Sequence, residues 1–140
     1  MSLQALQIYA GPVALAHIQK NGLQASDIGA VAAAAGGPKG LILGALDRFI
    51  FGQWLASSEQ AVHLIGASIG AWRMASACMP DPVAAFERLE QDYIAQRYDL
   101  APGQKRPSPQ MVSELFAQTI DAFLMPHANA ITQHPRYRLH

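Results

Sequence analysis

Residues 62–72, which read VHLIGASIGAW, contain the strongest structural signal in the chain. An apolar run meets a serine between two glycines and continues as apolar, helix-compatible sequence. This pattern predicts a strand, a sharp turn and a helix. A GxSxG turn is so tight that side chains two places from the serine would collide with neighbouring backbone, so glycine is needed at Gly66 and Gly70.

The serine at the centre of this turn is a candidate nucleophile. We expect the hydroxyl of Ser68 to project from the turn and the N–H of Ile69 to lie at the positive end of the helix, where it can hold the negative oxygen that develops in acyl transfer. GxSxG alone matches many proteins by chance. The alternative is a glycine-rich helix entry with a buried serine.

A second stretch of the same design lies upstream. Residues 28–35 read IGAVAAAA, and residues 36–40 read GGPKG before a long helical pattern. Two strand, glycine loop and helix units predict an α/β fold, with a parallel-sheet layer flanked by helices and the loops gathered at the carboxyl ends of the strands. The loop lacks GxGxxG, and Lys39 is followed by Gly40, so neither common phosphate-binding pattern is present.

The GG-x-[RK]-G loop followed by the GxSxG turn resembles the patatin-like phospholipases, a family of lipid acyl hydrolases. The matching motifs cover roughly residues 28 to 75. This resemblance implies a patatin-like fold, lipid or other ester substrates, no cofactor and no metal. It also implies a role for each matched residue: Ser68 as nucleophile, Gly36, Gly37 and Ile69 as oxyanion-hole amides, and Lys39, Gly40, Gly66 and Gly70 as supports of the loop and the turn.

Three features depart from the family pattern. Ala35 replaces the usual first glycine of the loop, and Lys39 stands where arginine is commoner. The resemblance also implies that an aspartate in an Asp-Gly-[Gly/Ala] motif takes the proton of the serine. None of the aspartates is followed by glycine: Asp27, Asp47, Asp81, Asp92, Asp99 and Asp121. We therefore expect an incomplete, amino-terminal part of a longer hydrolase, with little esterase turnover by itself because its base is missing.

Two other functions stay open at this point. One is an ordinary α/β-hydrolase with a Ser-Asp-His triad, for which His127, His134 or His140 would have to serve. The short spacing from serine to histidine and the upstream GGPKG loop count against it. The other is a non-catalytic binding or interaction domain that retains the fold.

Composition narrows the class of protein. The chain has 140 residues, 51% of them apolar, and a formal net charge of zero, which predicts one domain over 1–140 and no nucleic-acid partner. No secretory signal or membrane-spanning apolar run is visible, so we expect a cytoplasmic protein, with peripheral membrane contact left open. Cys78 is the only cysteine and is expected to be a buried thiol without a disulfide.

The remaining sequence reads mostly as helix. A short helix is expected over 12–20, and a longer one from Lys39 to Leu55 with Asp47 and Arg48 on its wetter side. Two more helices are expected to start at Pro82 and Pro109, capped by Asp81 and Ser108. Arg73, on the apolar helix after the serine, needs a carboxylate partner. Residues 99–109 form an exposed connector. The longer helix has its apolar stripe at Ile42, Leu43, Leu46, Phe49, Ile50 and Trp54.

The end of the chain combines a helix and the approach to a strand. Val112, Leu115, Phe116, Ile120, Phe123 and Leu124 form an apolar stripe, which we assign to the core, with a lid over an acyl pocket as the alternative. Residues 134–140 read as the approach to a further strand. Because so small a parallel sheet exposes its edges, we expect an oligomer or a further carboxyl-terminal part to cover them.

Overall fold

The computed structural model describes residues 7–100 and 102–140. Residues 1–6, which belong to the stretch read for a signal, and position 101 of the expected connector lie outside the described residues. The fold is α/β, as the sequence predicts: a parallel sheet in the order β1-β2-β3 with helices packed against it. Its strands are β1 (Ala30–Ala33), β2 (Val62–Gly66) and β3 (Tyr137–Leu139). The strand expected after residue 134 is thus present as β3.

Strand register brings the two glycine-containing segments together. Val31 pairs with Leu64, and Ala33 pairs with Gly66, so β1 and β2 end at the same edge of the sheet. Because the strands are parallel, the segments that follow them leave from that edge. The layout predicted from the two strand, loop and helix units is therefore confirmed.

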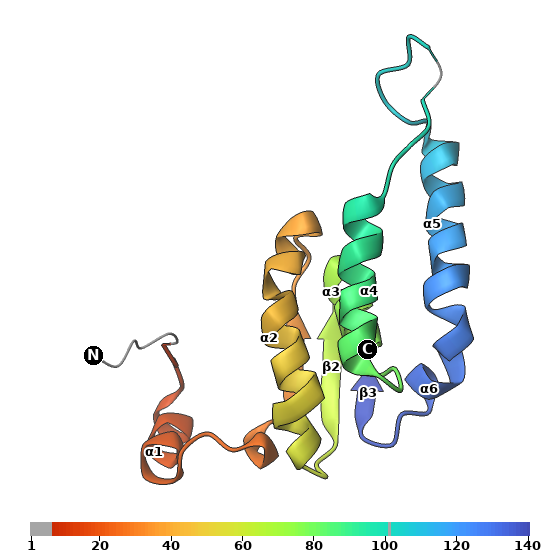
Figure 1. The fold of residues 1–140 in the computed structure, drawn as a ribbon. Coiled ribbons are helices and arrows are strands. Elements are labelled where there is room, and N and C mark those ends of the chain that lie inside the picture. Colours follow the sequence, from red (N-terminus) through yellow and green to blue (C-terminus); the bar gives the residue numbers. More distant parts are fainter. Residues whose placement is uncertain (1–6, 101) are drawn as a thin grey trace.

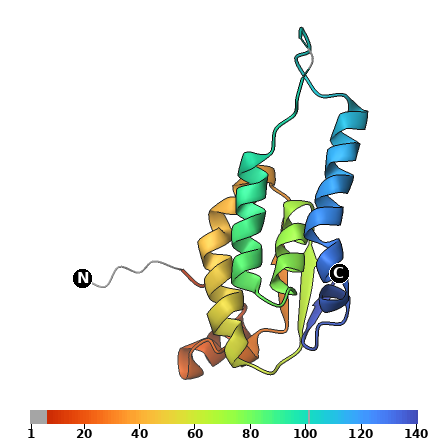
Figure 2. The ribbon, with the colours of Figure 1, turned by 45° about the vertical axis from the view of Figure 1, so that its right-hand side comes forward.

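The α-helices lie mainly on one side of the sheet. Figures 1 and 2 show α2, α3 and α4 side by side over the sheet, with α5 farther out. Their side chains and those of the strands form one core, which includes Leu64, Met74 and Phe86. The bounds are α1 (Pro12–Asn21), α2 (Gly44–Phe49), α3 (Ile69–Ala77), α4 (Pro82–Ala95), α5 (Pro109–Phe123) and α6 (Ala128–Thr132).

The second face of the sheet is uncovered in the described part of the chain. Along β2 the buried Val62 and Leu64 alternate with the exposed His63 and Ile65. The ring of His63 stacks on that of His140, with Nδ1 to Nε2 at 2.9 Å. Parallel sheets are usually covered on both faces, so this face is unusually bare.

The helix expected from Lys39 to Leu55 is divided. It consists of a 3₁₀ segment (Gly37–Leu43), α2, a π-helical segment (Ile50–Trp54) and a 3₁₀ turn (Leu55–Ser57). The predicted sidedness was wrong, because Asp47 is 4% exposed whereas Ile42 is 83% exposed.

Close packing explains this reversed face. An added Cβ at Gly40 would lie 2.8 Å from Ile69 Cγ2, and one at Gly52 would lie 2.5 Å from Val83 Cγ2. Asp47 is buried because its carboxylate binds Arg73, which confirms that Arg73 has a carboxylate partner. Small residues and this ion pair therefore set the inward face around α2, where Ile42, Leu46 and Phe49 are exposed. Farther along the stretch, Phe51 and Leu55 are buried.

Other local predictions are confirmed. The Asp81 carboxylate accepts the Ala84 N–H at 3.0 Å, and the Ser108 hydroxyl accepts the Met111 N–H at 3.1 Å, so both cap the helices expected there. Cys78 is fully buried, and burial raises the pKa of its thiol to about 11. Among the described residues, none of the helices is both long enough and apolar enough to cross a membrane.

Candidate active site

Ser68 sits in the turn between β2 and α3 with an unusual backbone. Its φ and ψ are 54° and −126°, and within residues 7–100 and 102–140 it is the only non-glycine residue with positive φ. Such a conformation costs on the order of 1–3 kcal/mol and is found mostly where the strain serves a site. Ser68 is exposed, so the alternative of a buried serine does not describe this turn.

The glycines on either side of Ser68 are sterically required. A Cβ at Gly66 would lie 2.5 Å from Ala71 Cα, and a Cβ at Gly70 would lie 2.1 Å from Ala33 O. All of these neighbours are backbone atoms, which cannot rotate away. The predicted reason for glycine at both positions is confirmed.

The glycine loop and the serine turn are neighbours at the carboxyl edge of the sheet. The Ala67 N–H donates to Ala33 O at 3.1 Å, which ties the turn to the end of β1. Gly40, the last glycine of the loop, lies directly against the Ile69 side chain. The two motifs that the sequence singled out are therefore packed on each other.

Some backbone amides beside Ser68 are used in hydrogen bonds and others are not. The N–H groups of Gly70 and Ala71 are used, because they donate to Ala67 O and Ser68 O, both at 2.9 Å. In the described residues, no hydrogen bond uses the N–H of Ile69, Gly36 or Gly37. The Ile69 amide lies at the amino end of α3, where the helix dipole favours a negative oxygen. Pro38 has no N–H to offer.

The basic residue of the loop has no partner that would fix it. Lys39 is exposed and forms no ion pair with the described residues. Gly37, two positions earlier, has a φ of 54°, a conformation that favours glycine. The shape of the loop therefore depends on Gly37 and Gly40 more visibly than on the lysine.

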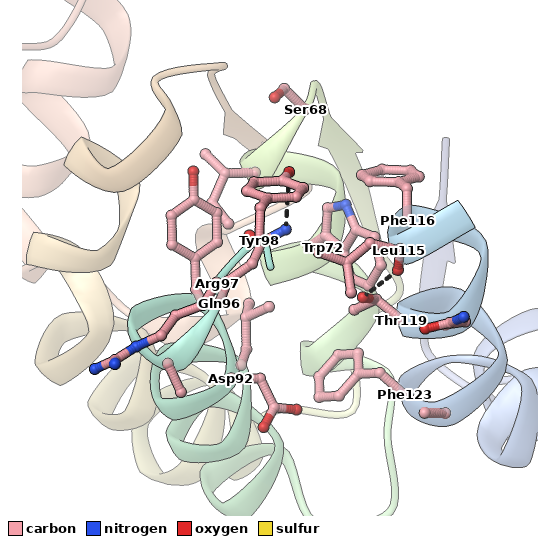
Figure 3. A pocket seen from close by; sticks show the side chains of 16 residues that line it. Ser68, Trp72, Asp92, Gln96, Arg97, Tyr98, Leu115, Phe116, Thr119 and Phe123 are labelled. Atoms are coloured by element: carbon pink, nitrogen blue, oxygen red, sulfur yellow. Dashed lines mark hydrogen bonds between the residues drawn. The ribbon is translucent and has the colours of Figure 1, made fainter. Parts of the chain in front are cut away.

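A cavity of about 620 Å³ opens beside Ser68 between α3, α4 and α5, within the size range typical of small-molecule sites. Figure 3 shows Ser68 at one end of it, with Trp72, Phe116 and Phe123 along its wall. The ring of Trp72 meets that of Phe116 edge-on at 5.4 Å. Its polar or charged lining residues include Asp92, Gln96, Arg97, Tyr98 and Thr119.

This cavity corrects the expectation for α5. Phe123 is buried, and Arg88 stacks on its ring at 5.3 Å and donates to Ala122 O at 3.0 Å. Phe116 is half exposed. The assignment of the whole stripe to the core was wrong for Val112, which is exposed, and for Phe116, which lines the cavity. No lid movement is needed to explain the exposure of Phe116.

No base lies on the Ser68 hydroxyl among the described residues. Asp92 lines the same cavity, but Figure 3 places it at the opposite end from Ser68, and its carboxylate binds Arg88 at 3.3 Å. The sequence suggested an acyl pocket only as the alternative for the stripe of α5 and did not place its walls on α3 and α4, because the distances between helices are not encoded in periodicity.

Two of the three late histidines are occupied elsewhere, and the third, His127, does not line the cavity beside Ser68. His134 Nδ1 accepts the N–H groups of Arg136 and Tyr137 at the start of β3, and so lies at the opposite edge of the sheet from Ser68. Burial, with Arg136 and Arg138 nearby, lowers the pKa of His134. The ring of His140 binds His63 on the bare face of the sheet. This arrangement counts against a Ser-Asp-His triad.

Fold and site together define an α/β domain with a strained, exposed serine at a strand-to-helix turn. No protein-family model, curated protein or solved structure matches this chain. Any function assigned to it rests on its sequence motifs and on the geometry of the site.

Proposed function

We propose that the chain supplies the nucleophile and the oxyanion hole of a serine acyl hydrolase that acts on lipid-type carboxylic esters, as its resemblance to patatin-like phospholipases implies. The observation that carries the proposal is the strained turn at Ser68, which stands at the end of an apolar cavity. Unused amides at Gly36, Gly37 and Ile69 lie on the two motifs that meet there.

The reaction follows from these groups. The Ser68 oxygen bonds to the ester carbonyl carbon as its proton leaves, and the carbonyl oxygen becomes an anion that accepts hydrogen bonds from the three amides. Collapse of this intermediate breaks the carbon–oxygen bond to the alcohol, which leaves with a proton. Water then releases the acyl group from the serine. The proposal assigns the base to an aspartate that this sequence does not contain.

The cavity supports a substrate with an apolar chain. Its wall is apolar and aromatic, formed by Trp72, Leu89, Phe116 and Phe123. Each methylene of a ligand that is buried against such a wall contributes about 0.8 kcal/mol to the binding free energy. With its carbonyl beside Ser68, an ester would extend its acyl chain toward Phe123. The head group would then lie near the polar lining side chains, such as Arg97 and Tyr98.

A fluorophosphonate with an alkyl tail tests the proposal. In this reaction the serine oxygen bonds to phosphorus and fluoride leaves. Oxyanion holes retain about 10³- to 10⁴-fold catalysis without the other catalytic groups, so we expect slow labelling at Ser68 and none in Ser68→Ala. Ser113 is exposed on α5, and Ser113→Ala is the control, in which Ser68 should label at the wild-type rate. Absence of labelling, or equal labelling at Ser57 and Ser113, would overturn the proposal.

One observation favours a second candidate, a binding domain without turnover. The described residues place no base on Ser68, and a cavity can bind an apolar ligand without chemistry. If Ser68 does not label while a fluorescent fatty acid binds wild type and fails to bind Phe116→Asp, this second function replaces the first.

A further inference from the structure

The buried ion pair between Asp47 and Arg73 is the polar contact that the acyl-hydrolase proposal leaves unused. Arg73 Nε donates to Asp47 Oδ2 at 2.6 Å, and its Nη2 donates to Oδ1 at 2.7 Å. The side chains are 8% and 5% exposed. Two parallel hydrogen bonds from a planar guanidinium fix both the distance and the orientation of the groups they join.

The pair connects the two helical segments that carry the site. Asp47 lies in α2, in the helical stretch that begins at Gly37 of the glycine loop. Arg73 lies in α3, whose amino end is the Ser68 turn. Between them Gly40 touches Ile69, so a shift of α2 against α3 would change the position of the loop relative to the serine.

Burial makes a purely stabilising role a weak explanation. Removing two charges from water is costly, and well-packed apolar residues of similar size often stabilise a core as well or better. What such residues cannot reproduce is a directional contact. A second pair, Arg48 with Glu90 at 3.1 Å, joins α2 to α4 and is more exposed, with side-chain exposures of 28% and 36%. It provides a matched comparison.

We propose that Asp47 and Arg73 are positioning residues: their bidentate pair sets the glycine-loop amides at the distance from Ser68 that an oxyanion requires. The inference rests on the proposed function for its chemical consequence. Its structural content, that the pair holds the loop against the turn, stands by itself.

Three variants separate position from stability. Asp47→Leu combined with Arg73→Met replaces the pair by apolar side chains and leaves no unpaired charge. Arg73→Lys keeps the charge but loses the planar fork. Glu90→Gln breaks the exposed pair and serves as control. Thermal midpoints are measured for all of them, so that a change at the site can be compared with a change in stability.

The first measurement is the rate of fluorophosphonate labelling at Ser68. A displacement of about 1 Å at a reacting centre costs about 10²-fold in rate. We expect the double variant to fold with a thermal midpoint near that of wild type and to label about 10²-fold more slowly. Arg73→Lys should lose about tenfold in rate, and Glu90→Gln should label at the wild-type rate.

The second measurement does not depend on chemistry at Ser68. Amide hydrogen exchange over residues 36–43 should be at least about tenfold faster in the double variant and in Arg73→Lys, with α4 unchanged. If the double variant does not fold, hydrogen exchange in Arg73→Lys tests the inference instead. Wild-type exchange over 36–43 in a folded variant overturns the inference. Faster exchange there with no labelling in wild type would retain the positioning role and reject the proposed hydrolase.

Discussion

Gly70→Ala tests the close approach that holds the serine turn against β1. Its Cβ would lie 2.1 Å from Ala33 O, 2.6 Å from Ala33 C and 3.0 Å from Ala34 O. Ordinary contact begins at 3.4 Å, so the oxygen and the new carbon must separate by about 1.3 Å. These atoms belong to the strand that leads into the glycine loop, and only a backbone shift can make that room.

These contacts set the loss of stability expected for Gly70→Ala. Forcing extra volume into packed structure costs about 1–3 kcal/mol. Losing the hydrogen bond from Ala67 N–H to Ala33 O costs about 1 kcal/mol, and replacing a helical glycine by alanine returns up to about 1 kcal/mol. We expect a net destabilisation of about 1–4 kcal/mol, and a value in the middle of that range lowers the Tm of a chain of this size by about 10 °C.

The assay is urea and thermal unfolding followed by circular dichroism, with Gly29→Ala as the matched control. Gly29 immediately precedes β1, and a Cβ there would meet nothing within 4 Å. Its replacement should leave stability unchanged or raise it by about 0.4–1 kcal/mol. If Gly70→Ala is less than about 1 kcal/mol below Gly29→Ala, the end of β1 yields freely and the close-packing explanation is wrong.

Four further predictions address the loop, the turn, the cavity and the thiol. Gly37→Val should slow labelling of Ser68 about 10²- to 10³-fold while the protein stays folded, because it displaces one oxyanion donor; unchanged labelling would place the oxyanion hole elsewhere. Ser68→Gly should raise the free energy of unfolding by about 1–2 kcal/mol by relieving the positive φ, and equal stability would mean that the turn stores no strain. Phe123→Ala should lower the free energy of unfolding in urea by about 3–5 kcal/mol, and Phe116→Ala should lower it clearly less because Phe116 is half exposed. Equal losses would mean that α5 is core throughout. Because burial raises the pKa of the Cys78 thiol to about 11, the folded state holds its proton more tightly than the unfolded state. Stability should therefore be fully present below about pH 9 and fall by about 2 kcal/mol as the pH rises to 11, a slope that Cys78→Ala should lack.

The sequence was most informative where backbone geometry demands particular residues. Residues 62–72 predicted the strand, the turn and the helix because two glycines flank a serine between apolar runs, and the close contacts at Gly66 and Gly70 show why nothing larger fits. Asp81 and Ser108 marked helix starts for a similarly local reason, since their oxygens satisfy amides within the same turn.

The prediction of the buried face of the 39–55 stretch failed, because that face depends on the elements that pack against it. Apolar spacing placed Ile42 and Phe49 inward and Asp47 outward, whereas the partner of Asp47 comes from α3, beyond the reach of any local pattern. The sequence feature that could have identified the buried face is the set of glycines at 40, 44 and 52. They recur at helical spacing on the face that packs most closely, and a face lined with glycine can bury backbone without a large apolar side chain.

The stripe on α5 shows a deeper limit of the same kind. An apolar residue that lines a cavity and one that fills a core are identical in periodicity, because both avoid water on one side of a helix. Phe123 and Phe116 share that side. Phe123 is held at the end where Arg88 joins α4 to α5, whereas Phe116 faces the space beside Ser68, with Trp72 edge-on to its ring. The distance between α4 and α5 therefore decides which end of the stripe is core. An apolar chain that fills this space would complete the burial that the stripe begins, as the proposed ester substrate requires.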